Sequence, residues 1–217
     1  MGKQESAELE VGAARTLRGG MMANAQLPKQ RASNLRDLCE RAQLEEDAKA
    51  LLKDEQTPRQ FLELLIGKEL FLDAIRLLAH ALPKRWAVGW GCLCVRHSLG
   101  TEDAAKISET HVAVEKWVYD PSEENRRAAQ AAADKEGSDS PSTLLAMAAF
   151  YSGGSIGPPQ FEPVAPPDHV TPQFVAGAVM IAAVETEPGK APQKHRAFLQ
   201  RGMTLLAKVQ PGTSSGG

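Results

Sequence analysis

The sequence predicts an all-α protein built as a single domain of about seven to nine helices. Its 217 residues suit one domain with tails. Apolar residues recur at helical spacing over most of the chain, and several of these stretches begin with a Ser, Thr or Asp followed by a proline. Alternating β-branched runs, the mark of a strand, are absent.

The domain organisation follows from where the apolar period begins and ends. Residues 1–32 carry mixed charge and Gly19-Gly20, without a sustained apolar period, and are expected to form a disordered N-terminal arm. Residues 33–210 are expected to form the helical domain, and 211–217 a flexible tail. Met21 or Met22 offers an alternative translation start.

The domain is expected to begin with a helix capped by Ser33 or Asn34, followed by a second short segment. Thr57 is predicted to cap the next helix, with Pro58 at its first position and Gln60 placed for a capping box. Leucine-rich helical spacing then continues to Leu82, and Gly67 either breaks this stretch into two helices or bends it.

The stretch from Leu82 to Leu99 is expected to be the central buried helix. Trp86 and Trp90 are four residues apart, which places both on one helical face. No charge falls between Trp86 and Val95, and a helix that is apolar nearly all round is usually the one that others pack against. Gly89 and Gly91 lower helix propensity there and indicate that a neighbouring backbone comes close.

Five further helices are expected after this one, the last of them amphipathic. Residues 117–119, Trp-Val-Tyr, are expected to belong to the core. The first four of these five later helices are predicted to begin at Thr101, Asp120-Pro121, Ser140-Pro141 and Thr171-Pro172.

Composition excludes several classes of function. A net charge of −2 gives no electrostatic case for nucleic acid or an anionic membrane, so we expect neither as a partner. No secretory signal precedes the domain, and the apolar run from Phe174 to Val184 is too short to span a bilayer. An odd number of cysteines, three, argues against a disulfide framework. We therefore expect a cytoplasmic protein.

No metal or cofactor site is expected. The five histidines are scattered without HExxH or Cys/His spacing. Cys92 and Cys94 are two residues apart, point to different helical faces, and are expected to be small buried hydrophobes. The sequence offers no catalytic residue by motif.

A glycine-rich loop after the third of the later helices is the most conspicuous candidate for binding. Such a turn can offer backbone N–H groups to a phosphate or an oxyanion. A phosphate loop, however, follows a strand and carries a lysine, whereas here a helix precedes and prolines follow. The alternative is a helix end leading into a rigid surface loop. The candidate binding residues are Ser152, Gly153, Gly154, Ser155, Pro158 and Pro159.

This loop runs on to Asp168 as about seventeen proline-rich residues without helix or strand, which is unusual inside a domain. It is either an ordered strap over the helices or a segment that docks a partner. Nearby, Arg126 and Arg127 are expected to form local ion pairs with Glu123 and Glu124, one helical turn earlier.

The chain from Leu82 to about Leu206 resembles a family of uncharacterised bacterial proteins, a domain of unknown function. The resemblance is carried by LPKRWAVGWGCLCVR, AVEKWVYDPSEENRRAA, LAMAAFYSGGSIGPP and VTPQFVAGAVMIAA. It implies an association with type VI secretion loci and an accessory or adaptor role. It supplies no catalytic residues.

Two functions remain open. The first is a non-enzymatic helical module that binds another protein, as an adaptor or accessory protein of a bacterial secretion system, with the glycine-proline loop at the rim of its surface. The second is an enzyme with an unrecognised active site around Ser152, Ser155 and a nearby His or Glu, which predicts a pocket with convergent titratable groups. The identity of the partner and the oligomeric state do not follow from the sequence.

Overall fold

The computed structural model describes residues 35–100, 107–137, 139–158 and 160–209. The predicted N-terminal arm and C-terminal tail lie outside these residues. The described part is all-helical, with ten α-helices, one 3-10 turn and no strand, which confirms the predicted fold class. The helix number exceeds the expected range by one, because the leucine-rich stretch that follows Thr57 forms two helices rather than one bent helix.

The first four helices are α2 (Leu35–Arg41), α3 (Glu46–Lys49), α4 (Pro58–Gly67) and α5 (Phe71–Ala81). Thr57 caps α4 with the predicted capping box: its hydroxyl accepts the amide proton of Gln60, and the Gln60 side chain accepts that of Thr57. The chain breaks after Gly67, because Glu69 adopts a positive φ of 61° between α4 and α5.

The later elements are α6 (Lys84–Leu99), α7 (Glu109–Tyr119), α8 (Glu123–Glu136), α9 (Pro141–Phe150), α10 (Val170–Glu185), the 3-10 turn η2 (Pro188–Lys190) and α11 (Ala191–Val209). Ser140 caps α9 as predicted. Two predicted starts are wrong. The helix α7 begins at Glu109 and is capped by Ser108, whereas the predicted start, Thr101, lies outside the described residues. The helix α8 is capped by Ser122 rather than by Asp120.

The predicted start at Thr171 agrees with α10 to within one residue, but Thr171 does not cap the helix. The helix α10 already begins at Val170, so Thr171 lies within its first turn. The Thr171 side chain is fully buried, and its hydroxyl donates to the Ala148 carbonyl of α9, 3.2 Å away. The Thr171 hydroxyl therefore joins α10 to α9 and does not cap a helix.

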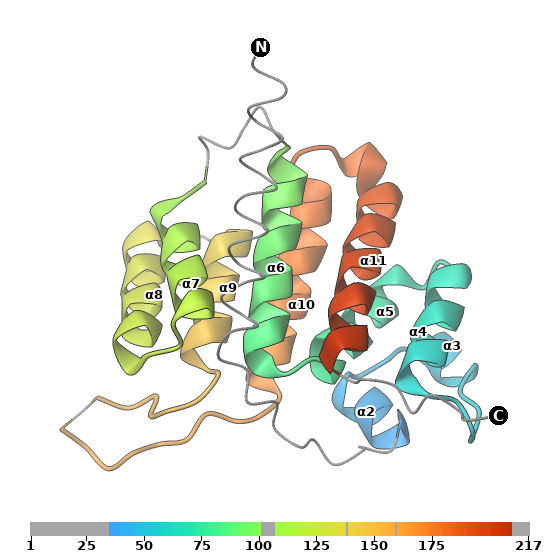
Figure 1. Cartoon of the computed structure of the whole chain (residues 1–217), viewed down its shortest axis with the longest axis horizontal. Helices are drawn as coiled ribbons and strands as arrows, with labels where there is room; N and C mark the ends of the chain where they lie inside the picture. Colours follow the sequence, from blue (N-terminus) through green and yellow to red (C-terminus); the bar gives the residue numbers. More distant parts are fainter. Residues whose placement is uncertain (1–34, 101–106, 138, 159, 210–217) are drawn as a thin grey trace.

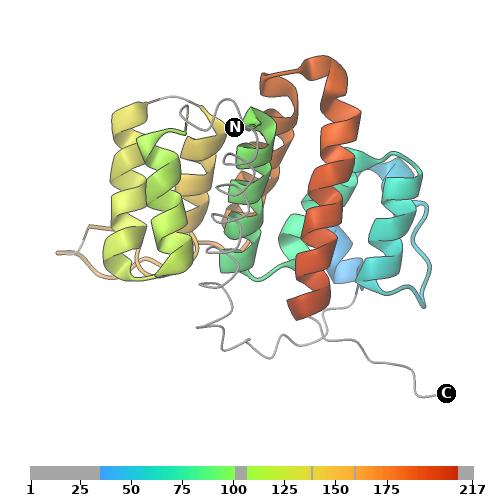
Figure 2. The same ribbon diagram turned by 45° about the horizontal axis from the view of Figure 1, so that its top comes forward.

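The helices α6 and α10 lie side by side in the middle of the molecule (Figures 1 and 2). On one side of this pair lie α7, α8 and α9, and on the other lie α11, α5 and α4 (Figure 1). The helix α6 contacts α5, α7, α9, α10 and α11, so the tryptophan helix is central as predicted. Its cysteines, Cys92 and Cys94, are fully buried and unpaired, which confirms their expected apolar role.

Trp90 joins the central helix to α11. Its side chain is fully buried, and its indole N–H donates to the Phe198 carbonyl at 2.9 Å. The helix α11 can approach this closely because residue 202 is glycine. A Cβ at Gly202 would lie 2.4 Å from Leu78 Cδ2 and 2.9 Å from Trp90 Nε1. The packing therefore requires a residue without a side chain at this crossing.

Gly91 plays a similar part on the opposite side of α6. A Cβ there would lie 2.3 Å from Cδ2 of Leu145 in α9, so the close neighbour is a leucine side chain rather than the predicted backbone. The predicted core status of the 117–119 run holds for Trp117 but is wrong for Tyr119, which is 56% exposed at the end of α7.

Trp90→Ala is expected to lower the free energy of unfolding by about 3–5 kcal/mol, because it removes a fully buried aromatic side chain and leaves a cavity between α6 and α11. Urea denaturation of the full chain measures this. Leu72→Ala, which changes an exposed residue of α5, is the control and should cost less than about 1 kcal/mol. Equal, small losses for both variants would contradict the central position of Trp90.

Candidate functional site

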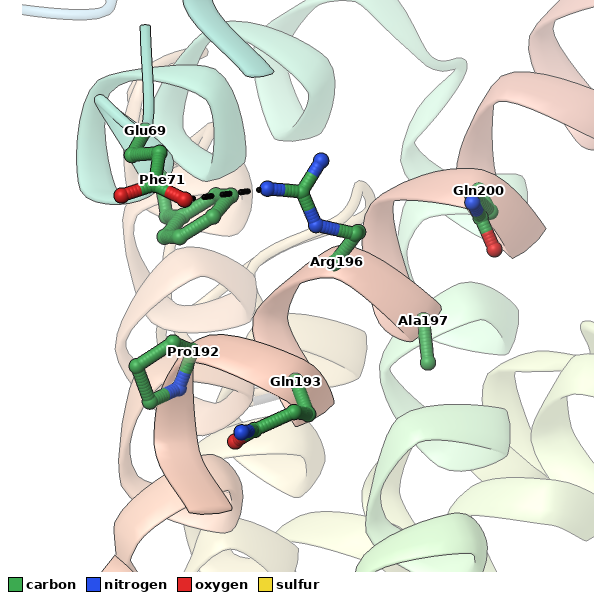
Figure 3. Close-up of a pocket in the computed structure, with 7 residues that line it drawn as sticks. All are labelled: Glu69, Phe71, Pro192, Gln193, Arg196, Ala197 and Gln200. Atoms are coloured by element: carbon green, nitrogen blue, oxygen red, sulfur yellow. Dashed lines mark hydrogen bonds and ion pairs between the residues drawn. The ribbon is translucent and has the colours of Figure 1, made fainter. Parts of the chain in front are cut away.

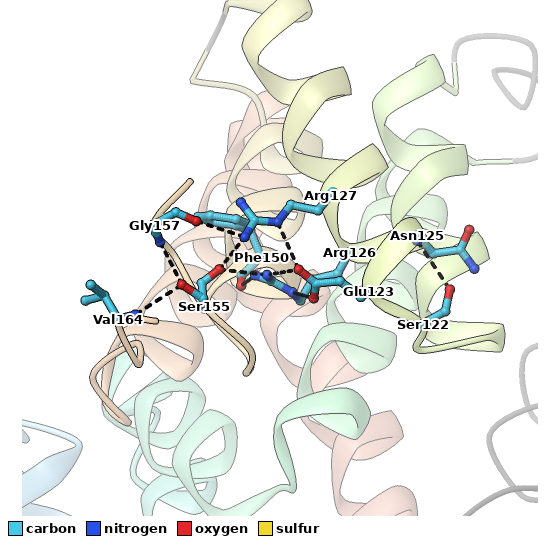
Figure 4. Close-up of polar contacts among 9 residues, drawn as sticks. All are labelled: Ser122, Glu123, Asn125, Arg126, Arg127, Phe150, Ser155, Gly157 and Val164. Atoms are coloured by element: carbon cyan, nitrogen blue, oxygen red, sulfur yellow. Dashed lines mark hydrogen bonds and ion pairs between the residues drawn. The ribbon is translucent and has the colours of Figure 1, made fainter. Parts of the chain in front are cut away.

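The loop between α9 and α10 is held by two arginines from the first turns of α8 (Figure 4). Arg126 Nε donates to Glu123 Oε2 at 2.6 Å, and Arg127 Nε donates to Glu123 Oε1 at 2.9 Å. These contacts confirm the predicted local ion pairs for Glu123, which serves both arginines, whereas Glu124 pairs with neither of them. The sequence did not predict that the two guanidinium groups also reach the loop.

Arg126 is 4% exposed and joins three parts of the chain. Its Nη1 donates to the Phe150 carbonyl at the end of α9, and its Nη2 donates to the Ser155 carbonyl at 2.9 Å. The guanidinium carbon also lies 4.7 Å from the centroid of the Phe150 ring, which is a cation–π distance. Burying a guanidinium is costly unless it is paired and hydrogen-bonded. Arg126 meets this requirement with a carboxylate, two backbone carbonyls and an aromatic ring.

Arg127 adds a second layer of contacts to the same loop. Its Nη2 donates to the carbonyls of Ser155, at 2.7 Å, and Gly157, at 3.0 Å. Hydrogen bonds from Arg126, together with those from Arg127, lower the pKa of Glu123 to about 2, against a smaller opposing effect of burial. Glu123 is therefore ionised at neutral pH and acts as the counter-ion of this arginine pair.

The predicted binding residues from Ser152 to Ser155 form the base of this loop. The Ser155 hydroxyl accepts the amide protons of Gly157, at 3.2 Å, and of Val164, at 3.1 Å, and thereby joins the two limbs of the loop. Ile156 N–H donates to the Val164 carbonyl and Ser152 N–H to the Ala149 carbonyl. These N–H groups are used within the loop and are not offered to an external anion.

Gly154 is required where the loop passes α8. Its φ is +66°, and a Cβ at this position would lie 3.0 Å from Glu123 Oε2 and 3.1 Å from Arg126 Nη2. The conspicuous glycine therefore permits the chain to approach the arginine pair. Glu123, the acidic residue that lies closest to this turn, has both carboxylate oxygens hydrogen-bonded to arginine.

Beyond its base the loop runs out past the end of α8 in both views (Figures 1 and 2). Pro158 is exposed there, and Pro159 lies outside the described residues. Two large apolar side chains of the loop are exposed, Phe161 by 66% and Val164 by 52%. The sequence analysis missed both, although an aromatic residue within a polar, proline-rich loop was an available signal.

A buried polar network joins α6, α7 and α9. The Ser142 hydroxyl lies 3.3 Å from His111 Nδ1, and His111 Nε2 lies 3.2 Å from Glu115 Oε1. Arg96 donates two hydrogen bonds to the same carboxylate. Burial alone would raise the pKa of Glu115, but the hydrogen bonds from Arg96 and His111 outweigh it and lower the pKa to about 2.

This network has the residue types of a serine–histidine–carboxylate relay, but its members are enclosed. His111 is fully buried and Ser142 is 7% exposed. Because Arg96 neutralises Glu115, the arrangement is that of a satisfied, half-buried ion pair that fixes α7 against α6 and α9.

A shallow hollow of about 360 Å³ lies between the start of α5 and α11 (Figure 3). Its two charged residues, Glu69 and Arg196, form an ion pair at 3.2 Å, and the Arg196 guanidinium also lies over the Phe71 ring. Ser152 and Ser155 do not line it. The hollow therefore does not supply the pocket that the enzyme hypothesis places around those serines.

A family model of a family of unknown function, DUF6931, matches residues 61–206, which is more than half of the chain. The chain belongs to this family. The match includes the tryptophan helix, the arginine pair and the whole loop, and so confirms the resemblance to a domain of unknown function. Neither the curated proteins nor the solved structures contain a match to the chain.

Two further findings concern only the residues that the structure describes. No helix among them combines the length and apolar character that crossing a bilayer demands. No group of three or more His, Cys, Asp or Glu side chains among them is placed to hold a metal ion.

Arg127→Ala is expected to loosen the loop without unfolding the domain, because Arg126 still caps α9. Amide exchange at Gly157 and Val164 should accelerate about tenfold, while the free energy of unfolding falls by about 1 kcal/mol or less. Hydrogen exchange read by NMR measures the first, and urea denaturation the second. Arg59→Ala, which breaks an exposed ion pair in α4, should leave both unchanged, and unaltered exchange in Arg127→Ala would contradict the clamp.

Glu115 is expected to contribute to stability in a pH-dependent way. Because its pKa falls from 4.5 to about 2 in the folded state, its contribution is present above pH 4.5 and is lost as the pH falls towards 2. Glu115→Gln should therefore cost about 3 kcal/mol at pH 7 and progressively less below pH 4.5, measured by urea denaturation across this range. Glu109→Gln, exposed on the same helix, should follow the wild-type curve. A Glu115→Gln deficit that does not shrink in acid would contradict the ion pair.

Proposed function

We propose that the protein is a non-enzymatic helical interaction module that binds another protein through the loop between α9 and α10. The observation that carries this proposal is the pair of exposed apolar side chains, Phe161 and Val164, on a loop whose base is fixed by Arg126 and Arg127. Exposed aromatic residues are frequent binding hot spots. A loop that is already positioned loses less conformational freedom when it binds.

In this proposal the predicted binding residues divide into two roles. Ser152, Gly153, Gly154 and Ser155 build the base of the loop, and Pro158 lies on its exposed outward part. Contact with the partner falls to Phe161 and Val164. The proline-rich composition supports this division, because prolines restrict the backbone between the base and the contact residues.

The setting that we propose is the bacterial cytoplasm. All three cysteines are unpaired and buried, which is the usual state in a reducing compartment. The resemblance to proteins associated with type VI secretion loci supports an adaptor or accessory role, and makes the cytoplasmic components of such a system the first partners to test.

The test replaces Phe161 with the photo-cross-linker p-benzoylphenylalanine in the full chain and identifies the protein that it captures. The captured partner is then purified, and its affinity is measured by calorimetry. Phe161→Asp with Val164→Asp should weaken binding by about a hundredfold, because truncated hot spots cost 2 kcal/mol or more, and the melting temperature should stay unchanged.

Leu72→Asp is the matched control, since it places the same charge on an exposed apolar residue of α5. It should leave the affinity unchanged. Capture at position 72 as efficient as at position 161, or equal loss of affinity in both variants, would overturn the assignment of the loop.

A further inference from the structure

A cavity of about 580 Å³ lies where α6 and α10 end and α11 begins. Figure 1 shows these three helix ends at the same end of the molecule. The wall of the cavity includes Leu99 and Gly100 at the end of α6, Thr186 after α10, and Lys194 and Ala197 in α11. None of the loop residues proposed to contact a protein partner lines it. Its volume falls within the range of ligand pockets, roughly 300–1,000 Å³.

Lys194 brings a buried cation to the wall of this cavity. Only 8% of the residue is exposed, and its ammonium group donates to the Thr186 hydroxyl at 2.6 Å. That hydroxyl donates in turn to the Ser98 carbonyl at 3.0 Å. Thr186 and Ser98 both line the cavity, and Thr186 is exposed, so the ammonium group of Lys194 lies beside the cavity.

No carboxylate pairs with Lys194 among the described residues. The only carboxylate of the cavity wall is that of Glu187, and it lies 2.7 Å from Lys190 Nζ. The hydrogen bond and the charge of Lys190 lower the pKa of Glu187, and the charge of Lys194 acts in the same direction. Glu187 is therefore within the electrostatic reach of Lys194 but forms its contact with the other lysine. The wall thus holds two ammonium groups and one carboxylate.

The hydrogen bonds of Lys194 are also incomplete. A lysine ammonium has three protons to donate, and among the described residues Lys194 has one acceptor, Thr186. Buried charges and buried polar groups are nearly always paired. The C-terminal ends of α6 and α10 carry partial negative charge that favours a cation at this place, but neither supplies a direct hydrogen bond to it. Two donors of a buried cation are thus available to a ligand in the cavity.

We propose that this cavity binds a small organic molecule through a carboxylate group, which accepts hydrogen bonds from the two remaining protons of Lys194. A carboxylate has two acceptor oxygens and a single charge, so it complements one ammonium group. A dianion such as phosphate would be repelled more strongly by Glu187 and by the ends of α6 and α10. A lone ion would also leave most of the cavity unfilled, whereas a short apolar body fits beside Leu99 and Ala197.

The test is an NMR titration of the ¹⁵N-labelled full chain with butyrate, near neutral pH and at constant ionic strength set with chloride. Butyrate is the probe because it joins a carboxylate to a short apolar body. The amide resonances of Gly100 and Ala197, which line the cavity, should shift saturably. Butyramide has nearly the same shape without the charge and should bind at least about tenfold more weakly.

Lys194→Met should abolish saturable butyrate binding. Because this change removes an unpaired charge and keeps the length of the side chain, the melting temperature is expected to rise by about 2 °C. Lys208→Met, at an exposed position of the same helix, is the matched control and should bind butyrate as the wild type does. Glu187→Gln keeps Lys194 but removes the one carboxylate of the wall, and should tighten butyrate binding about threefold.

Equal affinities for butyrate and butyramide would overturn the proposal, as would undiminished butyrate binding in Lys194→Met. Weaker butyrate binding in Glu187→Gln would show that this carboxylate does not oppose the ligand, and would contradict it as well. A melting temperature of Lys194→Met about 2 °C or more below that of Lys208→Met would mean that the fold already satisfies the ammonium group, which also overturns the proposal.

Discussion

The functional part of this molecule depends on a buried guanidinium, that of Arg126. Removing a cation from water is costly unless it is paired and hydrogen-bonded, and the folded state meets this requirement with Glu123, two carbonyls and the Phe150 ring. Because these partners belong to α8, α9 and the following loop, satisfying one side chain fixes three segments together. These contacts therefore also position the exposed side chains of the loop, Phe161 and Val164.

The rest of the fold supplies a rigid frame for that contact. The loop leaves from α9 and returns to α10, and these helices pack on each other and on α6. Trp90 and Gly202 hold α11 against the other side of α6, so the central layer is packed from both directions. The two ends of the loop therefore lie a fixed distance apart, which is the condition for presenting Phe161 and Val164 without a large entropic cost.

Local signals in the sequence predicted most of the helical scaffold. Thr57 and Ser140 cap their helices because side-chain capping depends on nearby residues alone. The prediction was wrong where a tertiary contact decides the role of a polar residue. Thr171 precedes a proline as a cap would, but its hydroxyl bonds to α9.

The position of the candidate site in the sequence was predicted, but the contacts that hold it together were not. The glycine-rich loop was recognised, but Arg126 and Arg127 were expected only to form local ion pairs. Their contacts with Phe150, Ser155 and Gly157 join residues more than 20 positions apart, which no spacing in the sequence reveals.

The most direct test of the clamped loop is a measurement of backbone ¹⁵N relaxation in the isolated full chain. The arginine contacts predict order parameters for Ile156, Gly157 and Val164 close to those of the flanking helices, about 0.85. Values below about 0.6 at all three residues would show a loop that moves freely on the nanosecond timescale, and would contradict the claim that Arg126 and Arg127 position it.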